Sequence, residues 1–459
     1  MTRHERADIV VIGLGPGGEE VAGRLAEAGL DVVGIEKELV GGECPYWGCV
    51  PSKMMIRAAN LLAEARRVDS MAGSAAVKPD WAPVARRIRD EATDTWDDKV
   101  AVERLEGKGG RFVRGAGAFS KPGHVVVGDL EIEAGRGVVI ATGTVPVIPP
   151  VKGLADLPYW TNRDAIKTEE VPDSLLVLGG GAIGLELAQV FARFGSHVTV
   201  VEGVDRLVSM EEPEASEMIA GVFAAEGIGI RTGSQVTAAH ADGQSLVLEL
   251  ADGSSVAGDR LLVATGRKTH FDGLGLDTIG IEAGARWVDV DDHMRAAAGV
   301  WAVGDVTGKG LFTHIAMYQA GIAVADILSN TRSDPADYRA IPRVTFTDPE
   351  IGSVGLSAAA AEKDGIRVRS GWASLPSSAR GWIHKAGNEG FIKLVEDADQ
   401  GVLVGATSAG PMGGEVLSLL ALAVHARVPV AELSSMIFAY PTFHRAIGDA
   451  LVDLRSKSD

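Results

Sequence analysis

The sequence carries one glycine-rich pattern twice, and this repeat strongly limits the folds available to the chain. The first copy, Gly13–Gly18, follows an apolar run at 7–13 and precedes a predicted helix at 19–28. The second copy, Gly179–Gly184, again follows an apolar run and precedes a predicted helix. A GxGxxG pattern between a strand and a helix is typical of a dinucleotide-binding βαβ unit. We therefore expect two such units in one chain.

An acidic residue ends the next predicted strand of each unit. Glu36 follows Gly18 by 18 residues, and Glu202 follows Gly184 by the same interval. In such units the glycines allow a tight turn and the close approach of a pyrophosphate, and the acid accepts from a ribose hydroxyl. The alternative, two glycine-rich turns without a ligand, requires chance duplication of both the motif and its spacing.

Further segments predict an α/β chain. The segment 54–102 is predicted to be helical, and Asp305 ends a short apolar strand. An acid at that position either faces the crevice in which parallel sheets bind ligands or only forms a turn. Beyond Pro335 the pattern changes to that of an α+β domain. Other strands are expected at 30–36, 137–141, 174–179, 197–202, 343–346, 390–395 and 401–407, and a strand followed by a turn is expected at 111–119.

Composition argues against several functional classes. The 459 residues carry a net charge of −18, which disfavours an electrostatic nucleic-acid interface. No stretch of about 18 residues is free of charge, so a membrane span is not expected. The N-terminus runs into the first predicted strand without a signal sequence. Together with the low cysteine count, these features predict a cytoplasmic protein.

The chain has only two cysteines, Cys44 and Cys49, and both lie within Gly41–Lys53. Three interpretations compete: an inert reduced pair, a zinc half-site and a redox-active disulfide. Zinc requires three or four protein ligands, and the neighbouring sequence offers no histidine or further cysteine. A Cys-x4-Cys spacing can close a short loop if the backbone is helical there. The redox interpretation is therefore the one to test.

The order of these motifs resembles that of the pyridine nucleotide-disulfide oxidoreductases, whose members include dihydrolipoamide dehydrogenase and mercuric reductase. The resemblance covers essentially the whole chain. It implies an α/β fold with two Rossmann-like dinucleotide-binding domains and a C-terminal α+β dimerisation domain, in a homodimer. The implied domains are an FAD-binding domain at 1–150 and 267–335, an NAD(P)-binding domain at 151–266 and a dimerisation domain at 336–459.

The resemblance also implies roles for individual side chains. Cys49 would lie against the flavin, and Cys44 would meet the substrate. Lys53, paired with Glu186, would stabilise negative charge on the reduced flavin, and Asp305 would hold its ribityl chain. Without the resemblance, Lys53 and Glu186 would be interpreted as solvated helix residues. The implied cofactor contacts are Gly13, Gly15, Gly18, Glu36, Gly42, Lys53, Gly117, Thr142, Gly143, Gly179, Gly181, Gly184, Glu202, Gly266, Gly304 and Asp305.

Glu202 bears on the choice of nucleotide. A carboxylate at that strand end accepts from the ribose hydroxyls of NAD and repels a 2′-phosphate. Gly203 and Val204 offer no basic side chain, but Arg206 follows closely and is a rival signal for NADP. We expect FAD in the first unit and NAD(H) rather than NADP(H) in the second.

The C-terminal segment departs from the family pattern. Members that reduce disulfides carry a His-Pro-Thr motif and a glutamate five residues after the histidine, whereas this chain has Tyr440 and Arg445. A tyrosine with a pKa of about 10 is a poor base near neutral pH. His444 could replace the missing base if a helix or turn directs it the same way as Tyr440, or it is a core histidine. Mercuric reductase-like members share a tyrosine here but typically add a C-terminal cysteine pair, which this chain lacks.

The sequence therefore predicts an FAD-dependent NAD(P)H:disulfide oxidoreductase, with Cys44, Cys49, Tyr440 and His444 among its catalytic candidates and a small-molecule disulfide as acceptor. One alternative keeps the flavin and thiols but reduces a metal ion, a quinone or another electrophile, because such acceptors need less proton transfer. A second alternative is a non-catalytic flavin-binding redox sensor or subunit. Trp47, between the cysteines, either narrows access to Cys44 or packs behind the disulfide.

Overall fold

The computed structural model describes residues 3–282, 284–329 and 334–457. The chain forms two compact units, each assembled from three separate stretches. Within the described residues, no helix is both long enough and apolar enough to cross a membrane. The first unit comprises Met1–Pro51, Arg86–Val147 and Arg267–Tyr338, and the second comprises Ser52–Ala85, Ile148–Gly266 and Arg339–Asp459.

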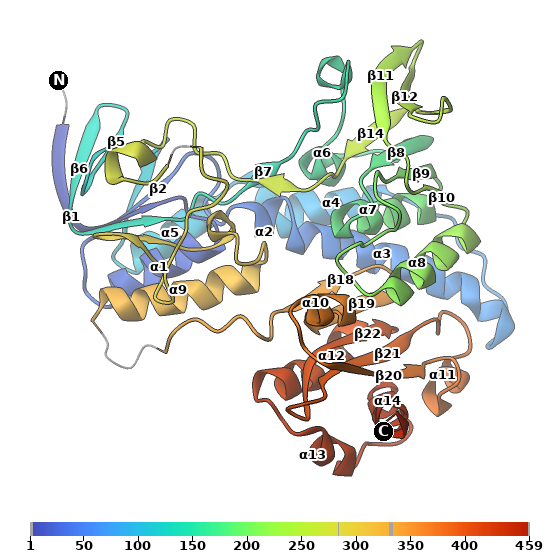
Figure 1. Cartoon of the computed structure of the whole chain (residues 1–459). Helices are drawn as coiled ribbons and strands as arrows, with labels where there is room; N and C mark the ends of the chain where they lie inside the picture. The colour runs from blue at the N-terminus through green and yellow to red at the C-terminus, as the bar shows by residue number, and fades with distance from the viewer. Residues whose placement is uncertain (1–2, 283, 330–333, 458–459) are drawn as a thin grey trace. The chain divides into compact units, whose positions relative to one another are not determined.

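The first unit is built on a sheet of eight strands with a parallel centre (Figure 1). Its strands are β1 Arg3–Ile12, β2 Val32–Glu36, β3 Arg111–Arg114, β4 Ala118–Lys121, β5 His124–Val127, β6 Leu130–Ile140, β16 Arg295–Ala297 and β17 Val300–Ala302. The main path runs in the order β16-β17-β6-β1-β2-β3, and the hairpin β4-β5 extends from β6. Since β1 pairs in parallel with both β2 and β6, the first glycine motif leaves the sheet at its centre.

Alternating side chains of β1 serve the two faces of this sheet. Three helices pack on one face: α1 Pro16–Glu27, α5 Lys99–Gly107 and α9 Thr313–Ile327. Ile9 and Val11 are buried against these helices. Val10 and Ile12 belong to the apolar cluster on the other face, with side chains of β5 and β6. The period of two that a strand imposes explains why this run of β1 is apolar at every position.

The second unit contains the second glycine motif in a parallel sheet of four strands with the order β10-β9-β8-β14, whose bounds are β8 Ser174–Leu178, β9 His197–Val201, β10 Gly229–Arg231 and β14 Arg260–Val263. Helix α7 (Ala182–Arg193) follows β8 directly, and α8 (Pro213–Ala225) precedes β10. An antiparallel sheet of three strands packs beside them through Leu246 and Leu248. Its strands are β11 Val236–Asp242, β12 Ser245–Leu250 and β13 Ser255–Gly258.

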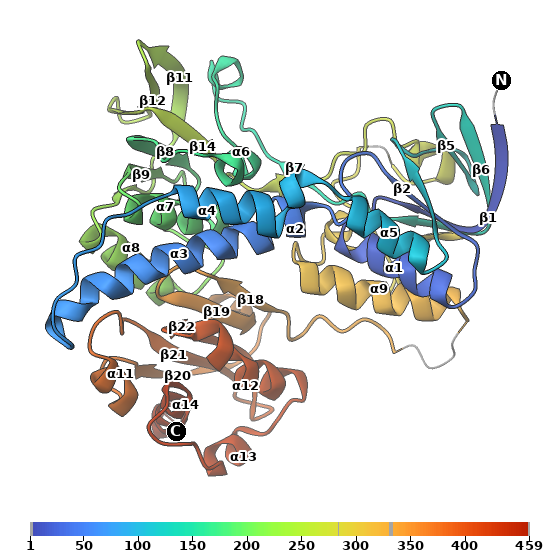
Figure 2. The ribbon, with the colours of Figure 1, turned by 180° about the vertical axis from the view of Figure 1, so that it is seen from behind.

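The C-terminal part of the second unit is an antiparallel sheet covered by helices (Figure 2). The strands are β18 Pro342–Thr345, β19 Glu350–Gly355, β20 Val368–Ser374, β21 Phe391–Asp397 and β22 Val402–Gly410, in the order β18-β19-β22-β21-β20. Helices α12 (Gly413–His425) and α14 (Ala446–Ser456) pack on it through Leu417, Leu420 and Leu451. The smaller helices are α6 Asn162–Lys167, α10 Ala358–Lys363, α11 Ala379–His384 and α13 Val430–Ser435.

The predicted fold class is confirmed, but two expectations about elements are wrong. The segment 54–102 is not helical throughout, because α3 spans Cys49–Arg67 and α4 only Ala82–Arg87. Between them Gly73 has a φ of +124° and Pro79 removes a backbone donor, and both interrupt a helix. Several strands were also not expected: β5, β11, β12, β13, β19 and β20. Strands β19 and β20 show no simple alternation of apolar and polar residues.

Candidate active site

Both cysteines lie at the start of helical elements. Cys44 is the second residue of α2 (Glu43–Tyr46), and Cys49 is the first residue of α3. Cys44 is half-buried and Cys49 is exposed. The Cys49 sulfur lies 3.4 Å from the hydroxyl of Thr313, the first residue of α9. Helical turns at both cysteines provide the compact loop that a disulfide between near neighbours requires.

The backbone before Cys44 passes directly against the first glycine motif. Gly41 donates its N–H to the carbonyl of Leu14 at 2.7 Å. Gly42 has a φ of +64°, and a Cβ atom there would lie 2.8 Å from the Gly15 Cα. Only glycine allows two backbones to approach this closely at that φ. The segment Val40–Cys49, called the cysteine loop below, and the predicted nucleotide loop Gly13–Gly18 are therefore neighbours.

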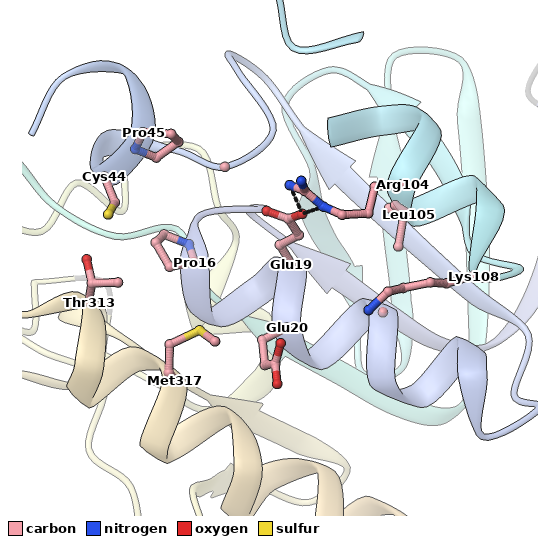
Figure 3. Close-up of a pocket in the computed structure, with 12 residues that line it drawn as sticks. Pro16, Glu19, Glu20, Cys44, Pro45, Arg104, Leu105, Lys108, Thr313 and Met317 are labelled. Carbon is pink, nitrogen blue, oxygen red and sulfur yellow. Dashed lines mark hydrogen bonds and ion pairs between the residues drawn. The ribbon is translucent and has the colours of Figure 1, made fainter. Parts of the chain in front are cut away.

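A groove of about 330 Å³ opens beside Cys44, between α1, α5 and α9 (Figure 3). Cys44 and Thr313 lie at one end of it, and an ion pair between Glu19 and Arg104 lies farther along. Arg104 Nε donates to Glu19 at 2.8 Å. Apolar side chains form much of the remaining wall: Pro16, Pro45, Leu105 and Met317. A thiol at the end of an open groove can meet a small molecule from solvent.

Trp47 packs behind the cysteine loop. Its side chain is 7% exposed, and its ring stacks on that of Trp96 with centroids 5.6 Å apart and an interplanar angle of 19°. Pro45, in contrast, lines the groove. Of the two interpretations of Trp47, the structure supports packing behind the cysteines.

The glycines of the first motif differ in what surrounds them. A Cβ atom at Gly13 would lie 2.4 Å from the Ala141 carbonyl oxygen, and one at Gly18 would lie 2.0 Å from the Gly13 carbonyl oxygen. A Cβ atom at Gly15 would meet nothing within 4 Å among the described residues. The outer glycines are therefore required by the fold, while the middle one borders open space at the N-terminus of α1. Such a space at a helix N-terminus suits a phosphate.

Other predicted FAD contacts surround this loop. Glu36 accepts from the Leu14 N–H at 2.8 Å, which holds its carboxylate at the glycine motif. The Thr142 hydroxyl is buried and has no hydrogen-bond partner in the part of the chain that the structure describes. Gly143 follows with a φ of +67° and open space where a Cβ would be. Because buried hydroxyls are normally hydrogen-bonded, these features fit a bound ligand such as FAD.

Asp305 belongs to a hydrogen-bonded network that sequence reasoning missed. Its Oδ2 accepts from the Thr144 hydroxyl at 2.8 Å, and Arg267 donates to both the hydroxyl and the carbonyl oxygen of Thr144. Arg267 also lies 3.6 Å from the Glu43 carboxylate, beside Cys44 in sequence. Burial raises the pKa of Asp305, although the Thr144 bond and the Arg267 charge act in the opposite direction. The network fixes the orientation of this carboxyl group.

The second glycine motif repeats the sterics of the first. Cβ atoms at Gly179 and Gly184 would lie 2.4 Å and 2.2 Å from backbone carbonyl oxygens, whereas one at Gly181 would meet nothing within 4 Å among the described residues. Glu202 accepts from the Gly180 N–H at 2.6 Å and from the Val204 N–H at 3.0 Å. A second nucleotide loop thus lies at the N-terminus of α7, with a carboxylate held beside it.

Three further glycines predicted to contact a cofactor differ in their backbone conformation and in the side chains around them. Gly117 packs between Ile12 and Ile35, where a Cβ would lie 3.2 Å and 3.3 Å from their side chains. Gly266 and Gly304 have φ values of +108° and +83°. Gly304 also donates its N–H to the buried side chain of Gln319, which anchors the turn before Asp305.

Lys53 and Glu186 form an ion pair within the second unit. Lys53 Nζ lies 2.8 Å from Glu186 Oε2 and 4.5 Å from the centre of the Phe346 ring. Glu186 Oε1 accepts from the Phe346 N–H at 2.8 Å. The Glu186 side chain is 7% exposed and that of Lys53 is 35% exposed. Lys53 follows Cys49 by one turn of α3, and a buried carboxylate holds its ammonium group.

The C-terminal candidates lie on irregular backbone. Tyr440 is 74% exposed, and His444 is half-buried with its ring 6.4 Å from that of Phe438. Thr442, between them, is extended, with a φ of −135° and a ψ of 159°. The helical spacing that would place Tyr440 and His444 on one face is therefore wrong. Arg445 pairs with Asp449 one turn later at 2.8 Å.

Two family models together match most of the chain. One, described as "Pyridine nucleotide-disulphide oxidoreductase", matches residues 7–320, and the other, described as the dimerisation domain of the same family, matches residues 341–451. The chain belongs to this family. It is accordingly an oxidoreductase of the FAD flavoprotein type that uses a pyridine nucleotide and a redox disulfide, and it carries the family's dimerisation domain.

Relatives within the family include enzymes with different names. The chain is 35% identical over 447 residues to a mercuric reductase of Acidithiobacillus ferrooxidans, across 95% of this chain and 80% of the relative. It is 33% identical over 458 residues to a dihydrolipoyl dehydrogenase of Chlorobaculum tepidum, across 97% and 96% of the two chains. The crystal structure of LpdA from Mycobacterium tuberculosis is similar with a TM-score of 0.85 at 27% identity, and covers 99% of this chain and 100% of its own. Family membership alone does not choose the acceptor.

Four side chains at this family site were absent from the sequence predictions. Thr144 and Arg267 directly follow Gly143 and Gly266, two glycines that the resemblance named as cofactor contacts, so their equivalent positions were an available signal. Thr313 and Trp96 had no such signal, because each reaches the cysteine loop only through the folded chain.

Proposed function

We propose that this flavoenzyme passes electrons from NAD(P)H, through FAD, to a Cys44–Cys49 disulfide and then to an acceptor at Cys44. The observation that carries the proposal is that Cys44 lines the open groove, while Cys49 contacts Thr313 at the start of α9. Bound FAD would supply two-electron transfer between nicotinamide and thiols. The disulfide takes up two electrons and two protons to become two thiols, and it returns them to the acceptor when it closes again.

A disulfide acceptor would react in two exchanges. The Cys44 thiolate attacks one acceptor sulfur, so a mixed disulfide forms and one acceptor thiol leaves. Cys49 then attacks the Cys44 sulfur, which releases the second acceptor thiol and restores the protein disulfide. Lys53 is held by Glu186. We propose that its positive charge stabilises the reduced flavin and a thiolate of the cysteine pair.

We further propose that the enzyme prefers NAD(H). Glu202 is held at the end of β9 by two backbone N–H groups, where a 2′-phosphate would be repelled. Arg206, the rival signal, donates to the carbonyl oxygens of Ser209 and Glu211 within its own loop. Steady-state kinetics with both nucleotides tests this: kcat/KM should be higher for NADH, and Glu202→Ser should reduce the ratio. Equal values for NADH and NADPH would contradict the preference.

A related flavoenzyme that reduces a metal ion, a quinone or another electrophile is the second candidate. Tyr440 stands where a disulfide-reducing member has its histidine, and such acceptors need less proton transfer from the protein. A non-catalytic sensor is disfavoured, because the chain belongs to an enzyme family and keeps both cysteines and the Lys53–Glu186 pair. A homodimer, a cytoplasmic location and domain boundaries near residues 150, 266 and 335 belong to the same proposal.

Anaerobic reduction by NADH tests the two thiols. The wild-type protein loaded with FAD should develop a long-wavelength absorption band on reduction. Cys49→Ser should lose this band, whereas Cys44→Ser should keep it and lose turnover with disulfides. A band unchanged in Cys49→Ser would show that the thiol roles are wrongly assigned.

An acceptor panel of lipoamide, a quinone and Hg(II) separates the two candidate functions. Lipoamide reduction that depends on Cys44 and rises about tenfold in Tyr440→His, which restores a base, supports the disulfide proposal. Faster turnover of Hg(II) or quinone, with no gain in Tyr440→His, supports the second candidate. If the Cys44→Ser variant still turns over every acceptor in the panel, both candidate functions are contradicted.

A further inference from the structure

A strained turn in the first unit lies against the cysteine loop. Asp94, Thr95 and Trp96 have φ values of +48°, +58° and +57°. Residues other than glycine adopt this region rarely and as single residues, and it is least favourable for a β-branched residue such as Thr95. Asp94 and Thr95 are exposed, so Trp96 is the member of the turn that packs inward. Such strain persists only where surrounding contacts hold it, and it indicates where to look for a function.

The ring of Trp96 contacts Trp47, one of the four residues between the two cysteines. Its indole is stacked on Trp47, with centroids 5.6 Å apart, and Trp47 is 7% exposed. The backbone N–H of Trp96 donates to the Thr93 hydroxyl at 3.4 Å, and that hydroxyl donates to the Arg89 carbonyl oxygen at 3.2 Å. The turn is therefore hydrogen-bonded to the preceding helical segment. Because the Trp96 ring is held in this way, its stacking restricts the movement of the Trp47 ring.

Asp98 provides a second contact from the same segment. Its carboxylate accepts from the Val40 N–H at 2.7 Å and from Arg114 at 2.5 Å, and its side chain is almost fully buried. Burial, and then the nearby charge of Asp98, raises the pKa of Tyr46. Residues 94–98 thus contact the cysteine loop before Cys44 and again between the two cysteines.

We propose that Trp96 is a positioning residue that, through Trp47, holds Cys44 and Cys49 close together when their disulfide is open. In the reduced protein the two sulfurs are joined only by the four residues Pro45–Gly48. Pinning Trp47 limits how far this segment relaxes, which raises the effective concentration of one thiol at the other. The stack therefore favours closure and makes the disulfide harder to reduce. This inference rests on the proposed redox role of the pair.

Equilibration with dithiothreitol tests the inference without measuring turnover. The full-length, FAD-loaded protein is incubated in mixtures of reduced and oxidised dithiothreitol, trapped with an alkylating agent and weighed by mass spectrometry. Two electrons and two protons pass from the reagent, whose own disulfide forms, to the protein pair. Because Cys44 and Cys49 are the only cysteines, the number of labels reports on this pair alone.

Trp96→Ala is expected to shift this equilibrium about tenfold toward the dithiol, which corresponds to about 30 mV. Trp96→Phe keeps an aromatic ring and should stay within about threefold of wild type. Thr95→Gly relieves the strain at that position while keeping Trp96, so it should leave the equilibrium unchanged. Trp301→Ala is the matched control, because Trp301 lies in the same unit but donates to Asp326 on α9, and it should also have no effect.

Several results would overturn the inference. They are an unchanged equilibrium in Trp96→Ala, an equal shift in Trp301→Ala, or a full shift in Trp96→Phe. If Trp96→Ala does not fold, Trp96→Leu retains apolar volume without a stacked ring and should show the shift, so an unchanged value there is equally decisive. A wild-type pair that forms no reversible disulfide would instead overturn the proposed function, and the inference with it.

Discussion

Glu186 is a single carboxylate that serves two separate elements. One of its oxygens pairs with Lys53 on α3, and the other accepts from the backbone that follows β18. In a double-mutant cycle of Lys53→Met and Glu186→Gln, we expect a coupling of about 1–2 kcal/mol in the free energy of unfolding. This is less than a fully buried pair would give, because Lys53 is partly exposed. Urea unfolding followed by circular dichroism measures it.

The exposed pair Lys457–Asp453, at the C-terminal end of α14, is the control for this cycle. Its coupling should be below about 0.5 kcal/mol. If the Lys53–Glu186 cycle gave no more than this control, the buried carboxylate would have no special role in holding Lys53.

Asp305 predicts a specific pH dependence of stability. Its pKa is raised by burial, so the folded chain keeps this proton at pH values where the unfolded chain, with an ordinary pKa of about 4, has lost it. The folded state then binds more protons, and stability falls as pH rises through that interval. Asp305→Asn should therefore match wild type at pH 4 and be more stable than wild type at pH 7. Urea unfolding of both proteins without FAD checks this, and a difference that is the same at both pH values would contradict it.

At the scale of elements, the strand–turn–helix unit separates residues needed for folding from residues needed for binding. Gly184→Ala should cost about 2 kcal/mol or more, because the new methyl group would meet the Gly179 carbonyl oxygen. Gly181→Ala meets open space and should cost no more than about 1 kcal/mol. It should nevertheless raise the KM for NADH about tenfold, since its methyl group occupies the space next to the helix N-terminus. Thermal unfolding should show the larger loss of stability in Gly184→Ala, and steady-state kinetics should show the raised KM for NADH in Gly181→Ala. If both variants lost stability equally, the distinction between the two positions would be refuted.

Some elements of this structure can be predicted from the sequence, and others cannot. Both glycine motifs and strand β8 were predicted well because their signals are local: an apolar run, fixed glycines and an acid at a fixed interval. The breaks between α3 and α5 were missed because alanine and arginine favour helix throughout, while Gly73, Pro79 and the strained turn at 94–96 act against them. The contacts of Cys49 with Thr313 and of Trp47 with Trp96 join residues far apart in sequence, so no local pattern indicates them.

For the whole molecule, the family's dimerisation domain predicts a homodimer. Several large apolar or aromatic side chains of this domain are exposed in the single chain, including Ile437 at 97% and Tyr440 at 74%. Ile437→Glu should shift a dimer toward monomer in sedimentation velocity at micromolar concentration, because it places a charge on such a surface. Met210→Glu, at a position that is 81% exposed outside the dimerisation domain, should leave the association unchanged. A wild-type protein that sediments as a monomer would contradict the prediction.

The repeated sterics of the two glycine motifs have an evolutionary consequence. In each motif the outer glycines are intolerant of any side chain, whereas a Cβ atom at the middle position would meet nothing within 4 Å among the described residues. A mutation at a middle position can therefore change one nucleotide site at little cost to the fold. A lineage carrying this architecture can exchange its electron donor in small, individually viable steps, while the chemistry at the cysteines is inherited unchanged.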